Sequence, residues 1–344
     1  MLTISQNLLA QTARSIFLIG DAGNDTTPNK TLLSLKDHLE STPNSMVVFL
    51  GDNIYPRGLD GTLEAQQKLM SQLSMLKKYN GEWIFIPGNH DWAKGRWKGY
   101  KNILRQQDFL EKFAHDSMAN RTYQFEHFFP KKGLPGPSVV DLGKTMLIIT
   151  DTDWWLQRQF FHEVGKTDPF PTMEKQYLKS LDSVLNVAKK TGKFPVFMSH
   201  HPLVNMGKHA LPNEPWRALV NYTPLQVFGI MGLNRAFLSE NQQPRYQRMA
   251  RKMLTILTKY EPYIAVSGHE HDLQYIQQGK AVYLISGSGS KLVEIPAKSF
   301  ENPELKFGKS VHGFMELVLE DAGKISVIVW GEDGKELYRK EGLF

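Results

Sequence analysis

The chain contains no cysteine among its 344 residues. This absence excludes disulfide bonds, thiolate metal sites and cysteine nucleophiles together, and it fits either a reducing or an oxidising compartment. Any chemistry that the protein performs must therefore use oxygen and nitrogen groups.

Long apolar runs are also missing, since none approaches the roughly 20 residues that a membrane-spanning helix needs. The first residues, MLTISQNLLAQTAR, contain too short and too polar an apolar segment for an intact signal peptide. We therefore expect a soluble chain. Its location stays open: it is exported, to the periplasm or outside the cell, if this segment is the remnant of a trimmed signal, and cytoplasmic otherwise.

The sequence has no internal repeat, no low-complexity linker and no sharp change in composition. We therefore expect one domain over residues 1–344, with possible insertions at 92–137 and 210–245 that carry no recognisable motif. The formal net charge is +6, and lysines and arginines are scattered along the chain. This pattern favours a solvated basic surface over a nucleic-acid interface, and it suits an anionic substrate.

Seven short apolar runs predict buried strands. They are continuous rather than alternating, so both faces of each strand should be covered. The runs are 15–20, 46–51, 83–88, 146–150, 194–199, 263–268 and 282–287. Helical spacing over 28–40 and 172–191 lies between them, which indicates an α/β fold. The carboxyl-terminal stretch predicts antiparallel strands around an Asp-Gly turn, so two layered sheets are expected.

Polar clusters follow five of these apolar runs. Each could be a turn or a packed strand end, but carboxyl ends of parallel strands meet at one edge of a sheet. Histidine, aspartate and asparagine together form a nitrogen and oxygen ligand set for first-row metals. The clusters are Asp21; Asp52, Asn53 and Tyr55; Asn89, His90 and Asp91; His200 and His201; and His269 and His271. This order and placement predict a metal site.

The series GDAG, GDNIY, GNHD, SHHP and GHEHDLQ resembles the calcineurin-like metallophosphoesterase superfamily from about Ile16 to Ser290. Within it, the chain resembles the small, tartrate-resistant type of purple acid phosphatase. Gly23 stands where most of the superfamily has histidine, and Tyr55 stands where most has a second aspartate. The resemblance implies a four-layer αββα sandwich of two mixed sheets flanked by helices.

The resemblance also implies two metal ions bridged by Asp52. One ion would take Asp21, Tyr55 and His271, and the other would take Asn89, His200 and His269. A tyrosine with an ordinary pKa near 10 binds as phenolate only beside a strong Lewis acid, which favours Fe³⁺ at the Tyr55 site. The partner would be a divalent ion, Fe, Zn or Mn.

The expected reaction is hydrolysis of a phosphate ester by direct in-line attack of a metal-bound hydroxide, because neither cysteine nor a Gly-x-Ser-x-Gly elbow is present. His90, oriented by Asp91, and His209, which follows His200 by nine residues, would contact the phosphoryl group or protonate the leaving group. An acidic-to-neutral pH optimum is expected. His201 is equally compatible with a pocket wall and with a catalytic role.

An acid phosphomonoesterase acting on a small phosphate ester or a phosphoprotein is the favoured function. A phosphodiesterase or nucleotide hydrolase on the same core is the close alternative. An intact ligand set argues against a non-catalytic module. The lack of an aromatic stacking series and of a single basic stripe argues against nucleic-acid binding. The sequence leaves the oligomeric state open.

Overall fold

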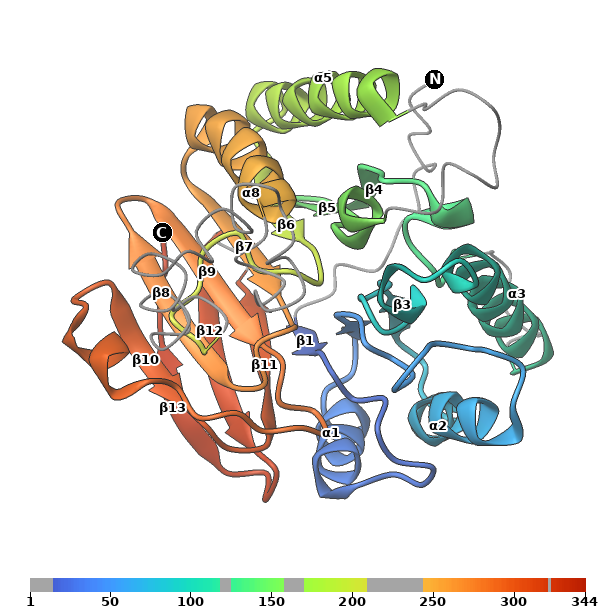
Figure 1. Cartoon of the computed structure of the whole chain (residues 1–344). Coiled ribbons are helices and arrows are strands. Elements are labelled where there is room, and N and C mark those ends of the chain that lie inside the picture. Colours follow the sequence, from blue (N-terminus) through green and yellow to red (C-terminus); the bar gives the residue numbers. More distant parts are fainter. Residues whose placement is uncertain (1–14, 118–124, 158–169, 209–243, 321–322) are drawn as a thin grey trace, which may run out of the picture.

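The computed structural model describes residues 15–117, 125–157, 170–208, 244–320 and 323–344. Their strands form two mixed sheets that face each other, with helices on the outer side of each sheet (Figure 1). This arrangement confirms the predicted αββα sandwich.

The first sheet has six strands, of which three are parallel neighbours and three form an antiparallel extension. In spatial order the strands are β13 (Glu336–Lys340), β12 (Ile325–Gly331), β11 (Gly313–Leu319), β1 (Ser15–Ile19), β2 (Ser45–Phe49) and β3 (Glu82–Phe85). Strands β1, β2 and β3 run parallel, so their carboxyl ends lie at the same edge. The antiparallel strands β11 to β13 are the ones expected from the carboxyl-terminal sequence.

The second sheet has seven strands with a parallel centre. In spatial order they are β10 (Leu305–Lys309), β8 (Leu273–Gln278), β9 (Ala281–Ser286), β7 (Tyr263–Ser267), β6 (Phe194–Met198), β5 (Thr145–Ile149) and β4 (Ser138–Leu142). The parallel strands are β9, β7, β6 and β5. This sheet therefore also gathers several carboxyl ends at one edge.

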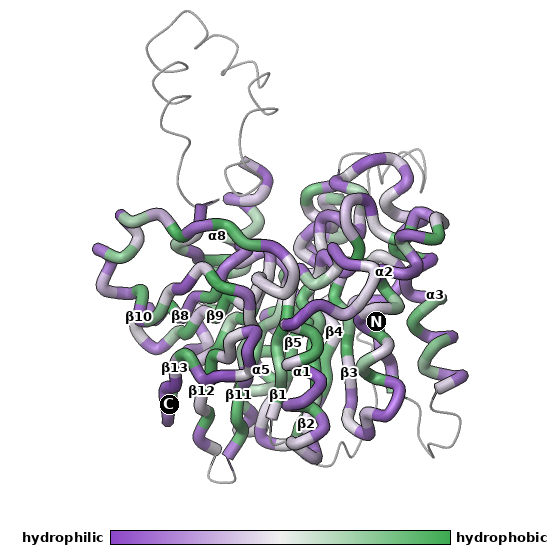
Figure 2. Tube along the Cα trace, turned by 90° about the horizontal axis from the view of Figure 1, so that it is seen from below, coloured by the Kyte–Doolittle hydropathy of each residue, from purple (hydrophilic) through white to green (hydrophobic). Residues whose placement is uncertain are grey.

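Alternate residues of each strand enter different parts of the core. In β1, Ile16 and Leu18 join a cluster between the two sheets, whereas Phe17 and Ile19 join the cluster that includes the helices. All four side chains are fully buried. Each such burial stabilises the fold by about 1.5–3 kcal/mol. Continuous apolar runs are therefore the pattern that this sandwich requires, and Figure 2 shows the hydrophobic strands inside a more hydrophilic shell.

Within the described residues, five helices cover the two outer faces. They are α1 (Lys30–Ser41), α2 (Leu63–Leu73), α3 (Gly99–Ser117), α5 (Phe170–Lys190) and α8 (Pro244–Leu257). Helices α5 and α8 lie together on one side, whereas α1, α2 and α3 lie on the other (Figure 1). Helix α1 begins where the Asn29 side chain accepts a hydrogen bond from Leu32 N, and α2 begins where Thr62 caps Ala65 N.

Short 3-10 helices complete the connections at η1 (Ser74–Leu76), η2 (Ala93–Gly95), η3 (Lys131–Gly133), η4 (Asp153–Leu156), η7 (Thr258–Tyr260) and η8 (Ala297–Glu301). Residues 209–243, which contain most of the second possible insertion, lie outside the described part of the chain. The single domain with insertions at 92–137 and 210–245 stays a prediction. Across the described ranges, every helix is too short or too polar to cross a bilayer.

Candidate metal centre

The strands bring the predicted ligands to one edge of the sandwich. Five parallel strands end near these ligands. They are β1, β2 and β3 in one sheet and β6 and β7 in the other, and each leads into a polar loop. The loops carry Asp21 after β1, Asp52 and Tyr55 after β2, Asn89 and His90 after β3, His200 after β6, and His269 and His271 after β7.

A first group joins Asp21, Tyr55 and His271. The Tyr55 hydroxyl donates a hydrogen bond to Asp21 Oδ1 at 2.8 Å and lies 3.3 Å from His271 Nε2. His271 Nε2 itself lies 3.4 Å from Asp21 Oδ1. These are the three residues that the resemblance assigns to a single ion, and they come from three different loops.

A second group joins Asn89, His200 and His269. His200 Nε2 lies 3.1 Å from Asn89 Oδ1 and 3.3 Å from His269 Nδ1. The same nitrogen lies 3.4 Å from Asp52 Oδ1. His200 Nδ1 lies 2.8 Å from the carbonyl of Leu50, a contact that fixes the ring and directs Nε2 toward the other ligands.

The donor atoms have the spacing that metal binding needs. Two sets of three potential ligand atoms each fall within 4.8 Å of one another, and the sets share His200. The sets are Asp21, Asp52 and His200, and His200, His201 and His269. Carboxylate and imidazole donors suit iron, zinc and manganese, so the residues present fit a pair of first-row ions. Their individual ligand roles stay predictions.

Three of the predicted ligands have a left-handed backbone. The φ angles of Asp21, Asp52 and His269 are 59°, 54° and 69°. Such a conformation costs of the order of 1–3 kcal/mol in a non-glycine residue and is found mostly at functional sites. Each loop therefore turns sharply directly after its strand and aims the side chain across the edge. The strain is consistent with a site that is shaped for a ligand.

Gly23 leaves no room for a side chain. A Cβ at this position would lie 2.1 Å from both the carbonyl carbon and the carbonyl oxygen of Asn53. The loop after β1 therefore packs directly on the backbone that leads to Tyr55. A histidine at position 23 is incompatible with this backbone path.

The charged groups of the site shift one another's pKa values. Burial raises the pKa of the Asp52 carboxyl, but the charges of His200 and His90 and the hydrogen bonds from His90 and Tyr55 outweigh burial and hold this pKa at about 2. Burial lowers the pKa of His200, but Asp52 and Asp21 raise it more, so the net shift is upward. Bound cations would take the place of such a proton on the histidine.

Tyr55 needs a cation to ionise. Burial and the neighbouring carboxylates Asp21 and Asp52 raise its pKa well above the ordinary value of 10. The hydroxyl therefore keeps its proton beside two carboxylates, and only a strongly charged ion could favour the phenolate. This requirement agrees with a trivalent ion at this position.

The expected pairing of His90 with Asp91 does not occur. His90 Nδ1 lies 2.8 Å from the carbonyl of Pro56, which orients the ring with Nε2 at 3.8 Å from Asp52 Oδ2. The Asp91 carboxylate instead accepts hydrogen bonds from the backbone of Gly88 and Asn53. It has this role because it is fully buried beneath the loops, where it ties the end of β2 to the end of β3.

Burial and the charge of Asp52 raise the pKa of Asp91 to about 8. The Asn53 side chain also donates to Asp91 and to the carbonyl of Ile86, so it links the same two loops. No separate role was predicted for Asn53 from the sequence. Its signal was its place directly after the predicted bridging aspartate.

His201 lies close to the predicted ligands. It is fully buried, its Nδ1 lies 3.0 Å from Thr152 Oγ1, and its backbone N–H donates to the same hydroxyl. Its ring centroid lies 4.5 Å from that of His269. His209 lies outside the described residues, so its predicted contact with the substrate stays a prediction.

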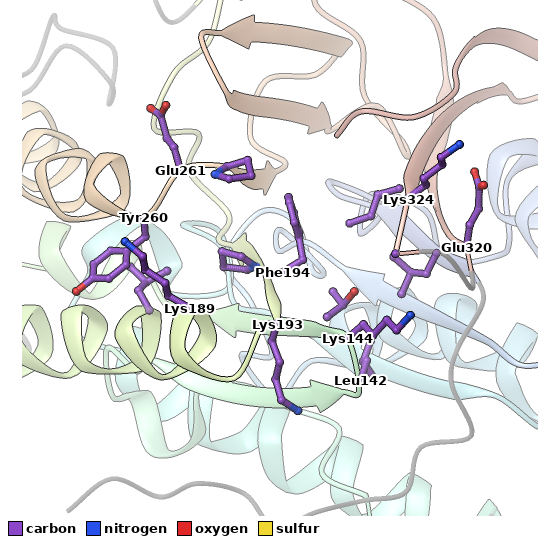
Figure 3. A pocket seen from close by; sticks show the side chains of 17 residues that line it. Leu142, Lys144, Lys189, Lys193, Phe194, Tyr260, Glu261, Glu320 and Lys324 are labelled. Carbon is purple, nitrogen blue, oxygen red and sulfur yellow. The ribbon is translucent and has the colours of Figure 1, made fainter.

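The cavity in Figure 3 is a different place. It has a volume of about 520 Å³ and is lined by apolar residues and by charged residues such as Lys189, Lys193 and Glu261. Phe194, which begins β6, and Thr145, which begins β5, lie on its wall. The predicted ligand His200 follows the opposite end of β6, so this cavity is not the metal centre.

Lys291 also lies at the site, although it was not predicted from the sequence. Its ammonium lies 3.6 Å from the centroid of the Tyr55 ring. Lys291 belongs to the loop after β9, another parallel strand whose carboxyl end lies at the same edge. This strand-end position was the available signal, although a lone lysine after a Gly-Ser stretch is otherwise ordinary.

Comparisons with known proteins agree with this geometry. The family model described as calcineurin-like phosphoesterase matches residues 15–273. Purple acid phosphatase 7 of Arabidopsis thaliana is 21% identical over 333 residues, which cover 94% of this chain and 84% of the relative. These matches confirm the resemblance to the superfamily and to its purple acid phosphatase branch.

Two solved structures share the fold. GAP50, described as the anchor in the inner membrane complex of Plasmodium, superposes with a TM-score of 0.59 and 17% identity, covering 95% of this chain and 88% of that one. Purple acid phosphatase PPD1 from yellow lupin (Lupinus luteus) seeds has a TM-score of 0.57 and 17% identity, covering 95% of this chain and 53% of that one.

Proposed function

Because the chain belongs to the calcineurin-like phosphoesterase family, we propose that it is a dinuclear metal-dependent phosphomonoesterase with an acidic-to-neutral optimum. The observation that carries the proposal is the contact of the Tyr55 hydroxyl with Asp21 and His271, at 2.8 and 3.3 Å. A tyrosine in this place suits Fe³⁺ with a divalent Fe, Zn or Mn ion beside it. The substrate would be a small phosphate ester or a phosphoprotein.

The predicted ligands form two sets, one for each ion, that share the carboxylate of Asp52. Asp21, Tyr55 and His271 would hold the ferric ion, and Asp52 would bridge to the second ion. Asn89, His200 and His269 would complete the second shell. When bound, the two ions would supply charge stabilisation for the phosphoryl group and activate the attacking water.

His90 is suited to handle a proton near the substrate. Because its Nδ1 is held at the carbonyl of Pro56, 2.8 Å away, Nδ1 carries a hydrogen and Nε2 faces the site. That nitrogen lies 3.8 Å from Asp52 Oδ2, so it borders the metal centre without occupying a ligand position. It can contact a phosphoryl oxygen, or give a proton to a leaving alkoxide when protonated.

Asp91 then acts on the loops rather than on the imidazole. Its carboxylate holds the backbone of Gly88 at 2.8 Å and of Asn53 at 3.1 Å. These contacts keep the Asp52 loop and the Asn89 loop in register. We propose a positioning role for Asp91, and a substrate-side role for His209 as the resemblance implies.

Elemental analysis beside an ester panel tests the proposal. Protein purified without chelators should contain two metal ions per chain, at least one of them iron. It should hydrolyse phosphomonoesters faster than phosphodiesters or nucleotides. A protein with two ions that prefers diesters would instead favour the phosphodiesterase function, and one without any hydrolytic activity would support a non-catalytic role.

A further inference from the structure

Lys291 lies beside the candidate metal centre, on the loop that follows β9. Lys291 Nζ lies 3.6 Å from the centroid of the Tyr55 ring. The charges of Asp52 and Asp21 act on this ammonium, and so do those of Lys94 and Lys68. Lys291 therefore lies within electrostatic reach of both predicted ligand groups.

The loop that carries Lys291 is fixed to two ligand loops. Directly before the lysine, the Ser290 hydroxyl donates a hydrogen bond to the carbonyl of Asp21. Two residues after it, Val293 N donates to the carbonyl of His271 at 2.9 Å. The backbone at position 291 is thus held between an anchor on the Asp21 loop and one on the His271 loop.

Further contacts hold the start of this loop. Gly289 N donates to the carbonyl of Gly20 at 3.1 Å, and the Asn29 side chain donates to the carbonyl of Gly289 at 2.9 Å. A lysine on an unanchored loop would lose side-chain and backbone freedom on meeting a ligand. Here folding has already ordered the backbone, so ligand binding loses only side-chain conformational entropy.

The ammonium is oriented but not neutralised. Within the described ranges, no carboxylate oxygen lies within 4 Å of Lys291 Nζ, although Asp52 and Asp21 are near enough to attract it. A contact with an aromatic face is worth only about 0.5–1 kcal/mol at a partly exposed site. The geometry leaves the hydrogens of the ammonium available to an anion at the metal centre.

The net charge of the centre determines which phosphate esters such a contact would favour. A ferric and a divalent ion bring five positive charges, and Asp21, Asp52 and ionised Tyr55 cancel three of them. A phosphomonoester carries about −1.5 to −2 near pH 7, whereas a diester carries only one negative charge. One more cation beside the centre would favour the monoester.

We propose that Lys291 is a specificity residue that hydrogen-bonds a phosphoryl oxygen and selects dianionic monoesters over monoanionic diesters. This inference rests on the proposed function, because it places the phosphoryl group at the metal centre. Lys94, on the loop after β3, is exposed and adds a more distant positive charge to the same rim.

Inorganic phosphate is the direct probe. Calorimetric titration of the metal-loaded protein should show that Lys291→Gln weakens phosphate binding about 10- to 100-fold, the range expected for one charge-assisted hydrogen bond. Lys291→Arg should stay within about threefold of the wild type because it keeps the charge. The matched control is Lys280→Gln, an exposed lysine just before the opposite end of β9, which should change nothing.

Ester kinetics provide the second measurement. Lys291→Gln should lower kcat/KM for a phosphomonoester about as much as it weakens phosphate binding, and for a matched diester by less than about threefold. Equal losses for both esters would overturn the inference, and so would unchanged phosphate affinity. Loss of metal from Lys291→Gln would also overturn it, because the lysine would then support Tyr55 rather than the substrate.

The two proposals can fail separately. A wild-type protein that binds two metals and phosphate but hydrolyses no ester would contradict the proposed function. The phosphate affinity of Lys291→Gln would still decide whether the lysine holds the anion. A metal-loaded wild type that binds no phosphate would overturn the role of Lys291 outright.

Discussion

Replacing Tyr55 by phenylalanine removes one hydroxyl from the centre of the candidate site. This hydroxyl donates a hydrogen bond to the buried carboxylate of Asp21 at 2.8 Å. Loss of a hydrogen bond to a charged group should lower the free energy of unfolding by about 1.5–3 kcal/mol. The ring should stay in place, because it packs beside His90 with centroids 4.2 Å apart. Asp21 also keeps its bond from His269 N at 2.7 Å.

The same variant tests the ferric site by colour. The resemblance implies that phenolate bound to Fe³⁺ absorbs visible light, so iron-loaded, oxidised wild type should be pink to purple, and Tyr55→Phe should lose the band. Urea unfolding of the metal-free protein gives the stability change. Tyr263→Phe is the matched control, since its buried hydroxyl lies 2.7 Å from that of Tyr283. It should lose about 0.5–1.5 kcal/mol and keep the band.

Two results would refute this reasoning. A visible band that persists in Tyr55→Phe would show that another group binds the ferric ion. A wild type that stays colourless after iron loading and oxidation would show that Tyr55 is a packed aromatic residue. The second result would remove the purple acid phosphatase assignment and leave a two-metal hydrolase.

Four further variants test the remaining predictions. Asp52→Ala should lose both metals in elemental analysis, whereas Asn89→Ala should lose chiefly one, because only Asp52 is expected to bridge; two metals retained by Asp52→Ala would contradict the assignment. His209→Ala should keep both metals and lower the monoesterase rate by roughly 10²–10⁴-fold, with smaller losses for esters with good leaving groups. Equal losses for all esters would mark it as a binding residue. Burial raises the pKa of Asp151 in the folded protein to about 7. As pH rises, this carboxyl therefore loses its proton in the unfolded chain before it does so in the folded protein. Stability from this group should therefore fall between about pH 4 and pH 7, by at most about 4 kcal/mol. Asp151→Asn should flatten this slope in urea unfolding at pH 5 and pH 8, and parallel slopes would contradict the shifted pKa.

The strands were predictable because this sandwich buries both faces of its central strands. The run at 46–51 covers all of β2 except its first residue, and the run at 194–199 contains β6. Such runs need no knowledge of tertiary contacts, since burial on two sides leaves an unbroken apolar stretch. The end of each run then locates a loop at the common edge.

Helix α3 was not predicted, because polar residues interrupt its buried face. Asn102, Gln106 and Gln107 are buried on it beside apolar residues. The Asn102 side chain donates to the carbonyl of Arg57 at 2.7 Å, and Gln107 accepts from Lys132 N at 2.7 Å. These side chains hydrogen-bond to loop backbone, and they break up the apolar stripe of Ile103, Leu110 and Ala114 by which the helix could have been recognised.

The candidate site shows a similar division. Asp21, Asp52 and His200 could be predicted as ligands because each follows a predicted strand. The orientation of His90 by the carbonyl of Pro56 was missed, since a backbone acceptor leaves no mark in the side-chain sequence. Lys291 was missed because its position depends on loop contacts with residues far away in the chain.

Gly23 and Tyr55 look like two separate departures from the superfamily pattern, but the structure makes them one feature. Gly23 N donates to the carbonyl of Asp52 at 3.2 Å, and Tyr55 N donates to the carbonyl of Gly23 at 3.0 Å. The loops after β1 and β2 are therefore joined at the place where a histidine side chain would otherwise stand. A side chain at position 23 would displace the backbone between Asp52 and Tyr55, and with it the hydroxyl that meets Asp21. The backbone contact that excludes the histidine is thus the same contact that places the tyrosine.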